Sequence, residues 1–193
     1  FLRHFVWYRV YDGLEVDQAS MDRLRQAAAR GPLLFLPTHR SHVDYLLLSY
    51  FINAAGLAPP HIAAGANLNF PLVGPLLRRG GAFFLRRSFK GEPLYATVFR
   101  EYLHTMLVRG FPIAYFIEGG RSRSGRTLSP KGGLLGMTLE SFMREHPRPV
   151  LLVPIWFGYE KLLEGRSLLA ELEGKPKRGE SLADLVRVTR QLK

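Results

Sequence analysis

The chain has 193 residues, of which 47% are hydrophobic and 12% aromatic, and it contains no cysteine. This size suits one domain with a proper core, and the lack of cysteine excludes disulfides, thiolate zinc sites and a cysteine nucleophile. Its 27 lysines and arginines against 16 acidic residues give a formal charge of +11, which favours anionic partners.

Hydrophobic periodicity predicts helices that alternate with short strands. In chain order, the sequence predicts a helix over residues 16–30, a strand over 33–36, a helix over 45–55, strands over 62–64 and 82–85, a helix over 93–108, a strand over 112–117, a helix over 131–145 and a strand over 150–157. This order is typical of the α/β class, and we expect a single layered domain over residues 1–193 with a mixed sheet flanked by helices.

The two ends of the chain carry expectations of their own. The sequence starts without a methionine or a signal-peptide layout, and no apolar run approaches the roughly 18 to 20 residues that cross a bilayer. We therefore expect a segment excised from a longer chain. Residues 160–193 turn basic and predict a C-terminal extension of the same domain, with a short amphipathic helix opening at Ser181.

The segment 68–77 is apolar, but it contains two prolines and a glycine. These residues disfavour a long regular helix. One interpretation is a buried loop with a short helix. The other is a surface that contacts an acyl chain or a membrane.

His39 and Asp44 are five residues apart in the polar turn between the strand 33–36 and the next predicted helix. On one ideal helix, positions five apart point about 140° away from each other, so facing side chains require His39 to lie in the turn. An imidazole removes a proton near neutral pH, and a carboxylate on its other nitrogen fixes the tautomer and stabilises the imidazolium. The pair therefore predicts a general base that acts on an alcohol.

The residues alone leave two alternatives at this turn. Ser41 has the position of a helix N-cap with Asp44 at N3, where an acidic residue favours the helix dipole without any catalysis. His42 is the alternative base.

Two groups of cations stand beside glycines and aromatic residues, which suggests one anion pocket. The first group is Arg78, Arg79, Arg86, Arg87 and Lys90, and the second is Arg121, Arg123, Arg126 and Lys131. Neighbouring strand residues point to opposite faces, so only one of Arg86 and Arg87 enters a given pocket. Arginine binds phosphate through a planar charged fork, which makes the first group a candidate phosphate clamp.

Residues 116–126 follow a predicted strand, and α/β proteins place ligand sites beyond the carboxyl ends of strands. Gly119 allows backbone amides to approach an anion, while Arg121 and Arg123 supply opposing charge. For Glu118 we consider three roles: it orients an arginine, accepts a substrate hydroxyl or acts structurally like a helix cap. The glycine pattern matches neither a dinucleotide fingerprint nor a P-loop, so nothing supports ATP or NAD.

Four ordered blocks resemble those of the glycerol-3-phosphate 1-O-acyltransferase family, most closely its large bacterial membrane-bound form. The blocks are His39–Tyr45, Gly81–Arg87, Phe116–Arg123 and Val153–Ile155. The resemblance covers nearly the whole chain and implies a glycerolipid acyltransferase-like fold. It also implies transfer of a fatty acyl group from acyl-CoA or acyl-carrier protein to the sn-1 hydroxyl of glycerol 3-phosphate, which gives lysophosphatidate in the first step of phospholipid synthesis.

The resemblance further implies roles, partners and a location. His39 is the general base and Asp44 its partner, and Pro154 belongs to a block associated with acyl-donor binding or site architecture. The substrate-binding residues are Phe84, Arg86, Arg87, Glu118, Gly119, Arg121, Ser122 and Arg123. No metal and no cofactor besides the acyl donor is implied. The expected location is the cytoplasmic face of the bacterial inner membrane, against an anionic lipid surface.

Three alternatives remain. Lysophosphatidate acyltransferases and dihydroxyacetone-phosphate acyltransferases share related blocks. A non-catalytic module that binds anionic membrane would use the charge of +11 without needing His39. We expect no nucleic-acid partner, because the aromatic residues form no stacking-platform pattern.

Overall fold

The computed structural model describes most of the chain. The described residues are 15–41, 43–86, 88–122, 124–144 and 148–159, together with Leu162, Gly165, Leu169 and Glu173. The chain divides into two compact units, one formed by residues 22–158 and the other by residues 1–21 with 159–193. We call the first the core unit. The helix expected from Ser181 lies outside the described residues.

The core unit is built on a parallel sheet. Its strands are β1 (Leu33–Pro37), β2 (His61–Gly65), β3 (Ala82–Leu85), β4 (Ile113–Ala114) and β5 (Leu151–Ile155), in the order β3-β2-β4-β1-β5. The predicted α/β class is confirmed. We expected a mixed sheet, but each pairing between these described strands is parallel, because consecutive strands are joined by helical crossovers instead of hairpins.

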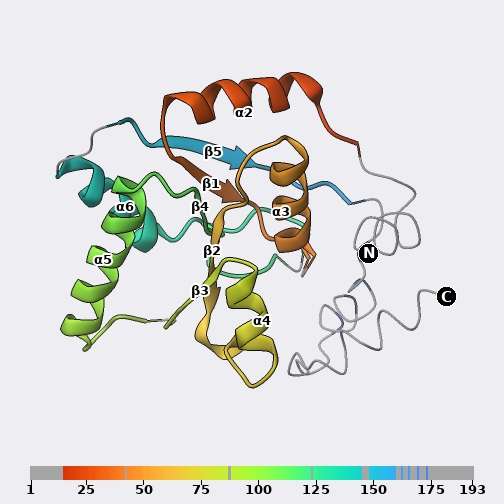
Figure 1. The fold of residues 1–193 in the computed structure, drawn as a ribbon. Coiled ribbons are helices and arrows are strands. Elements are labelled where there is room, and N and C mark those ends of the chain that lie inside the picture. The colour runs from red at the N-terminus through yellow and green to blue at the C-terminus, as the bar shows by residue number, and fades with distance from the viewer. Residues whose placement is uncertain are drawn as a thin grey trace. The chain divides into compact units, whose positions relative to one another are not determined.

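Helices cover both faces of the sheet. They are α2 (Gln18–Arg30), α3 (Asp44–Ala54), the 3-10 turn η1 (Ala66–Leu68), α4 (Val73–Arg79), α5 (Pro93–Val108) and α6 (Gly132–Met143). Figure 1 shows α3 and α4 on one face and α5 and α6 on the other. None of the helices within the described ranges combines the length and the apolar character needed to cross a bilayer.

The core lies mainly between the sheet and α5. Leu103 and Leu107 of α5 are 1% and 0% exposed, and Leu34 of β1 and Ile113 of β4 are fully buried against them. Burying a side chain of this size stabilises the fold by about 1.5 to 3 kcal/mol. The sheet is therefore a rigid base from which the loops at its carboxyl edge extend.

The segment 112–117 differs from its prediction. We expected a strand to residue 117, but β4 ends at Ala114. The Tyr115 N–H still donates to the Phe35 carbonyl at 3.2 Å, and then a turn closes with the Gly119 N–H on the Phe116 carbonyl at 2.9 Å. The chain leaves the sheet early because residues 116–118 turn toward the His39 segment.

Candidate active site

The first and third blocks meet at the carboxyl edge of the sheet. His39 follows β1 and Glu118 follows β4, and these two strands are direct neighbours. His39 is 7% exposed, Asp44 0% and Glu118 2%. Buried polar groups of this kind are stable only when they are hydrogen-bonded, so their partners define the site.

His39 and Asp44 form the predicted pair. The His39 Nδ1 and Asp44 Oδ2 atoms are 2.8 Å apart. The same oxygen accepts the backbone N–H groups of Arg40 at 2.7 Å and Ser41 at 3.0 Å. An ionised carboxylate only accepts, so Nδ1 is the donor of this hydrogen bond, and in the neutral ring Nε2 is then the nitrogen with the lone pair. The His39 ring also packs on Phe116, with 4.2 Å between ring centroids.

The prediction that Ser41 is the N-cap is wrong, but Asp44 does lie in the first turn of α3, where an acidic residue favours the helix dipole. Helix α3 begins at Asp44, and its N-cap is Val43, which makes no side-chain capping bond. The Ser41 hydroxyl instead accepts the Val43 N–H at 3.4 Å. The Asp44 carboxylate folds back over the preceding turn, which is why it reaches His39. The alternative base, His42, lies outside the described residues.

Glu118 fastens the His39 turn to the third block. Its Oε1 atom accepts the His39 N–H at 3.0 Å, and its Oε2 atom accepts the Leu128 N–H at 2.7 Å. These contacts match the structural alternative of the sequence-based interpretation. They differ from the two other interpretations, in which Glu118 orients an arginine or accepts a substrate hydroxyl. The carboxylate therefore joins the two ends of the loop 118–128 and attaches them to the His39 turn.

The same loop is bound to the His39 turn at its middle. The Ser122 N–H donates to the His39 carbonyl at 2.8 Å. The Arg40 guanidinium donates from Nη1 to the Ser122 hydroxyl at 3.3 Å and to the Gly125 carbonyl, and from Nη2 to the Thr127 hydroxyl at 3.1 Å. Arg40 is only 8% exposed.

Arg40 is a site residue that the sequence-based reasoning missed. Its position between His39 and Asp44 in the sequence predicted no role for it. The sequence did contain one indication of its role. Arg40 lies in a turn between two apolar segments, and a charged side chain that becomes buried there has to find hydrogen-bond acceptors inside the protein. Its effect is to shape the loop that carries the cations of the third block.

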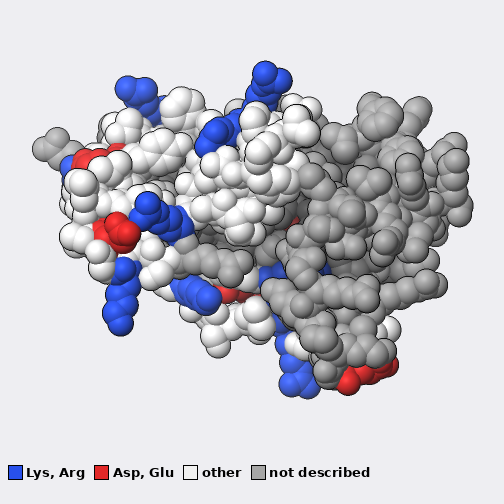
Figure 2. All heavy atoms as spheres, turned by 90° about the horizontal axis from the view of Figure 1, so that it is seen from below, with Lys and Arg blue, Asp and Glu red and all other residues white. Residues whose placement is uncertain are grey.

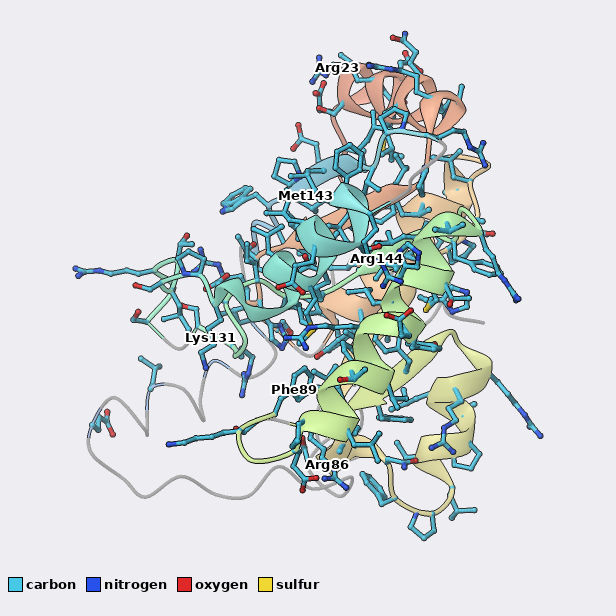
Figure 3. The ribbon with its side chains drawn as sticks, turned by 90° about the vertical axis from the view of Figure 1, so that its left-hand side faces the viewer. Arg23, Arg86, Phe89, Lys131, Met143 and Arg144 are labelled. Atoms are coloured by element: carbon cyan, nitrogen blue, oxygen red, sulfur yellow. The ribbon has the colours of Figure 1, made fainter. Side chains whose placement is uncertain are left out.

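Gly119 is required for its backbone conformation. Its φ angle is +63°, and a Cβ atom placed there would lie 2.6 Å from the Lys131 Cδ atom. The positive φ angle disfavours any side chain at this position, whereas the flexible Lys131 side chain could move away from an added Cβ atom. Figure 3 shows Lys131 at the start of α6, beside the third-block loop. The anion-binding role expected for Gly119 stays a prediction, as does that of Arg121, which is half-buried next to Ser122.

Arg86 of the second block is engaged away from the His39 turn. Its Nη1 atom pairs with Glu92 Oε1 at 2.8 Å, and its guanidinium lies over the Tyr95 ring at 4.9 Å. Figure 3 shows Arg86 beside the first turn of α5. Three strand spacings separate β3 from β1, which is about 14 Å. In the residues that the structure describes, the Arg86 side chain therefore contacts α5 and not the His39 turn.

For the other predicted substrate-binding residues of the second block, the structure describes Phe84 alone. Phe84 is half-buried in β3, and Arg78 lies over its ring at 5.2 Å. Arg87 and Arg123 lie outside the described residues. Their substrate-binding roles stay predictions.

The fourth block lies on β5 and pairs with β1, the strand that leads into the His39 turn. Pro154 of β5 is exposed and pairs in register with Leu36 of β1. Just beyond, the Thr38 N–H donates to the Ile155 carbonyl at 2.9 Å. These contacts hold the residue before His39, so the observed role of the block is architectural. The acyl-donor role of Pro154 stays a prediction.

Comparison with known proteins identifies the family. Residues 18–158, more than half of the chain, match the profile of a family described as Acyltransferase. The chain belongs to the acyltransferase family. Over 187 residues, or 97% of the chain, its sequence is 55% identical to a glycerol-3-phosphate acyltransferase of Ectopseudomonas mendocina and 54% identical to one of Pseudomonas savastanoi pv. phaseolicola. The resemblance inferred from the four blocks is confirmed.

The chain spans 22% of the length of these two curated relatives. Among solved structures, it is similar to the 1-acyl-sn-glycerophosphate (LPA) acyltransferase PlsC of Thermotoga maritima. That similarity has a TM-score of 0.41, 16% sequence identity and coverage of 86% of each chain.

Proposed function

We propose that this chain carries the site for transfer of a fatty acyl group from acyl-CoA or acyl-carrier protein to the sn-1 hydroxyl of glycerol 3-phosphate, which gives lysophosphatidate. The observation that carries the proposal is the buried pair of His39 Nδ1 and Asp44 Oδ2 at 2.8 Å. The relatives named glycerol-3-phosphate acyltransferase support the choice of acceptor.

In the proposed mechanism, the acceptor hydroxyl gives its proton to His39 Nε2 while its oxygen attacks the thioester carbonyl carbon. The C–O bond forms, the C–S bond breaks, and the departing thiolate takes the proton back from Nε2. Asp44 stabilises the transient imidazolium through Nδ1–H. The backbone N–H groups of Arg40 and Ser41 donate to Asp44 Oδ2 and hold the carboxylate in the orientation that this task needs.

The third-block loop supplies the binding side of the proposal. A phosphate held by the cations of this loop fixes the acceptor hydroxyl relative to Nε2, and such positioning is a large part of catalysis of this kind. Arg121 is the described candidate, and Arg87 is the matching residue of the second block. The fixed link from Ser122 N–H to the His39 carbonyl supports this arrangement, because it makes the loop and the base one unit.

We also propose that the reaction takes place against an anionic lipid surface, at the cytoplasmic face of the bacterial inner membrane. The formal charge of +11 supports an anionic partner. The proposed steps use the acyl donor as co-substrate and need no metal or other cofactor.

A chimera tests the reaction. The chain replaces the matched region of the Ectopseudomonas mendocina relative, and acyl transfer is measured with radiolabelled palmitoyl-CoA and, in parallel, an acyl-carrier-protein thioester. We expect transfer to glycerol 3-phosphate. His39→Ala in the chimera should lower kcat by about 10² to 10⁴ or more, which is the contribution of a general base.

A matched variant and two other acceptors complete the test. His61→Ala removes a half-buried histidine of β2 and should leave kcat unchanged. Lysophosphatidate and dihydroxyacetone phosphate are offered in place of glycerol 3-phosphate. Preference for either one would replace the proposed acceptor, and full turnover in a folded His39→Ala chimera would remove the proposed base.

A further inference from the structure

The loop before α4 and the outer side of α4 form an exposed apolar surface that ends in an arginine. Leu72 is 88% exposed and Leu76 is 66% exposed. Pro71, Pro75 and Arg79 beside them are exposed as well. Leu76 and Arg79 are three residues apart on the helix and therefore neighbours, and Leu72 is one turn earlier. We call these five residues the α4 surface.

Leu72 also has an unfavourable backbone conformation. Its φ angle is 70°, and it is the one non-glycine residue with positive φ in the described ranges. Side chains with a Cβ atom are disfavoured in this region. The chain thus holds a leucine both strained and in water, without any gain from burial in the core unit. Strained positions cluster where a protein meets a ligand or partner.

The stretch of sequence that carries the α4 surface has charge of one sign. None of the 47 residues between Asp44 and Glu92 is acidic, and the same stretch contains five lysines and arginines. Figure 2 views the molecule from below, the side on which α4 lies in Figure 1, and that face shows basic side chains at several places and acidic ones at others. An exposed apolar patch on a stretch of the chain that is cationic and free of acidic residues fits a lipid bilayer, which has an apolar interior and an anionic surface.

The α4 surface begins at the same edge of the sheet as the candidate base. The chain leaves the carboxyl end of β2 at Gly65 and reaches Leu72 through η1. Because all the described strands are parallel, this edge is also where His39 follows β1. Two strand spacings separate β2 from β1, which is about 10 Å.

We propose that the α4 surface docks on an anionic lipid bilayer, with Leu72 and Leu76 among the acyl chains and Arg79 on lipid phosphates. The proposal deepens the proposed function and rests on it for its purpose, since long-chain acyl donors and a lysophospholipid product both partition into bilayers. A short segment that lies in the interface needs an apolar side and cations at its border, which is the composition found here.

Vesicle binding of the purified chain tests the surface. We expect co-sedimentation with vesicles of phosphatidylglycerol and phosphatidylcholine, and weaker binding in high salt or with phosphatidylcholine alone. The double variant Leu72→Ser with Leu76→Ser should weaken binding by about tenfold or more for each leucine. The matched control is Leu94→Ser with Val98→Ser on α5, two apolar residues that are 77% and 59% exposed, and it should bind like the wild type.

A fluorophore provides a second measurement that does not depend on a loss of binding. The chain contains no cysteine, so Leu72→Cys gives one labelling site without further changes. An environment-sensitive dye at this position should shift to the blue with phosphatidylglycerol vesicles and be quenched by spin-labelled lipid. The same dye on Leu94→Cys should show neither effect.

Several results would overturn the proposal. They are absence of vesicle binding by the wild type, equal losses in the α4 and α5 double variants, and a dye at position 72 that stays in water. A change of sedimentation coefficient caused by the α4 double variant would instead assign the surface to a second copy of the chain. Binding is measured without turnover, and His39→Ala should bind normally, so this proposal and the proposed reaction can fail separately.

Discussion

Two clusters of charged side chains follow strands of one sheet and are held in opposite ways. After β1 and β4, Arg40 and Glu118 are 8% and 2% exposed and bond inside the protein. After β3, the Arg86 and Glu92 side chains are 55% and 53% exposed and pair with each other. The sequence shows cations beside glycines after β4 and around β3. Only the cluster of Arg40 and Glu118, however, is part of the packed interior.

Because the two clusters differ in burial, they contribute differently to the free energy of unfolding. Removing a partner from a buried hydrogen bond costs about 1 to 3 kcal/mol, and more where a charge is left. An exposed ion pair contributes about 0 to 1 kcal/mol. The cluster at His39 therefore determines the geometry of the site. The cluster at Arg86 adds little to the stability of the fold.

The largest expected effect comes from Glu118→Gln. A glutamine side chain accepts one of the two backbone N–H groups but points its own amide hydrogens at the other, so a buried donor loses its acceptor. We expect the free energy of unfolding to fall by about 2 to 3 kcal/mol, measured by urea denaturation. Acyl transfer by the chimera should fall as well, because the His39 turn loses one of its attachments.

The matched control makes the same chemical change in the exposed cluster. Glu92→Gln keeps the size of the side chain and removes one exposed charge, so the free energy of unfolding should change by less than about 1 kcal/mol. Equal losses of stability in the two variants would contradict the division into a buried and an exposed cluster.

Much of the fold could be predicted because local signals determine it. The predicted bounds of the strand 82–85 and the helix 93–108 match β3 and α5 to the residue, since glycines and Pro93 mark their ends. The place of His39 in the turn before α3 followed from helix geometry, because positions five apart cannot face each other on one helix.

The internal contacts of the site could not be predicted in the same way. A buried arginine such as Arg40 and an exposed one such as Arg86 have the same local appearance, and what separates them is contact with residues about 80 positions away. The early end of β4 has the same origin. The segment 115–117 is apolar enough for a strand, but after Tyr115 the chain leaves the sheet and Phe116 packs on His39.

Arg40→Lys should have the second largest effect. The guanidinium fork reaches the Ser122 hydroxyl, the Gly125 carbonyl and the Thr127 hydroxyl, while a lysine ammonium is a point charge that cannot span all three. We expect a loss of about 1 to 2 kcal/mol in the free energy of unfolding and, in the chimera, a higher KM for glycerol 3-phosphate with little change in KM for the acyl donor.

The control for this variant is Arg86→Lys, which should leave the free energy of unfolding within about 0.5 kcal/mol of the wild type. If Arg40→Lys were as stable as the wild type and bound glycerol 3-phosphate equally well, Arg40 would have no part in shaping the loop 118–128.

Apart from the control variants, the smallest effect on stability is expected from Arg86→Ala, and this variant sharpens the comparison most. The pair with Glu92 and the contact with Tyr95 are exposed, so the free energy of unfolding should fall by less than about 1 kcal/mol. If the second block binds phosphate, Arg86 in the wild type leaves Glu92 and pairs with the substrate. The variant then has a higher KM for glycerol 3-phosphate, while its free energy of unfolding stays close to that of the wild type. An unchanged KM together with unchanged stability would limit phosphate binding to the loop after β4 and to residues other than Arg86.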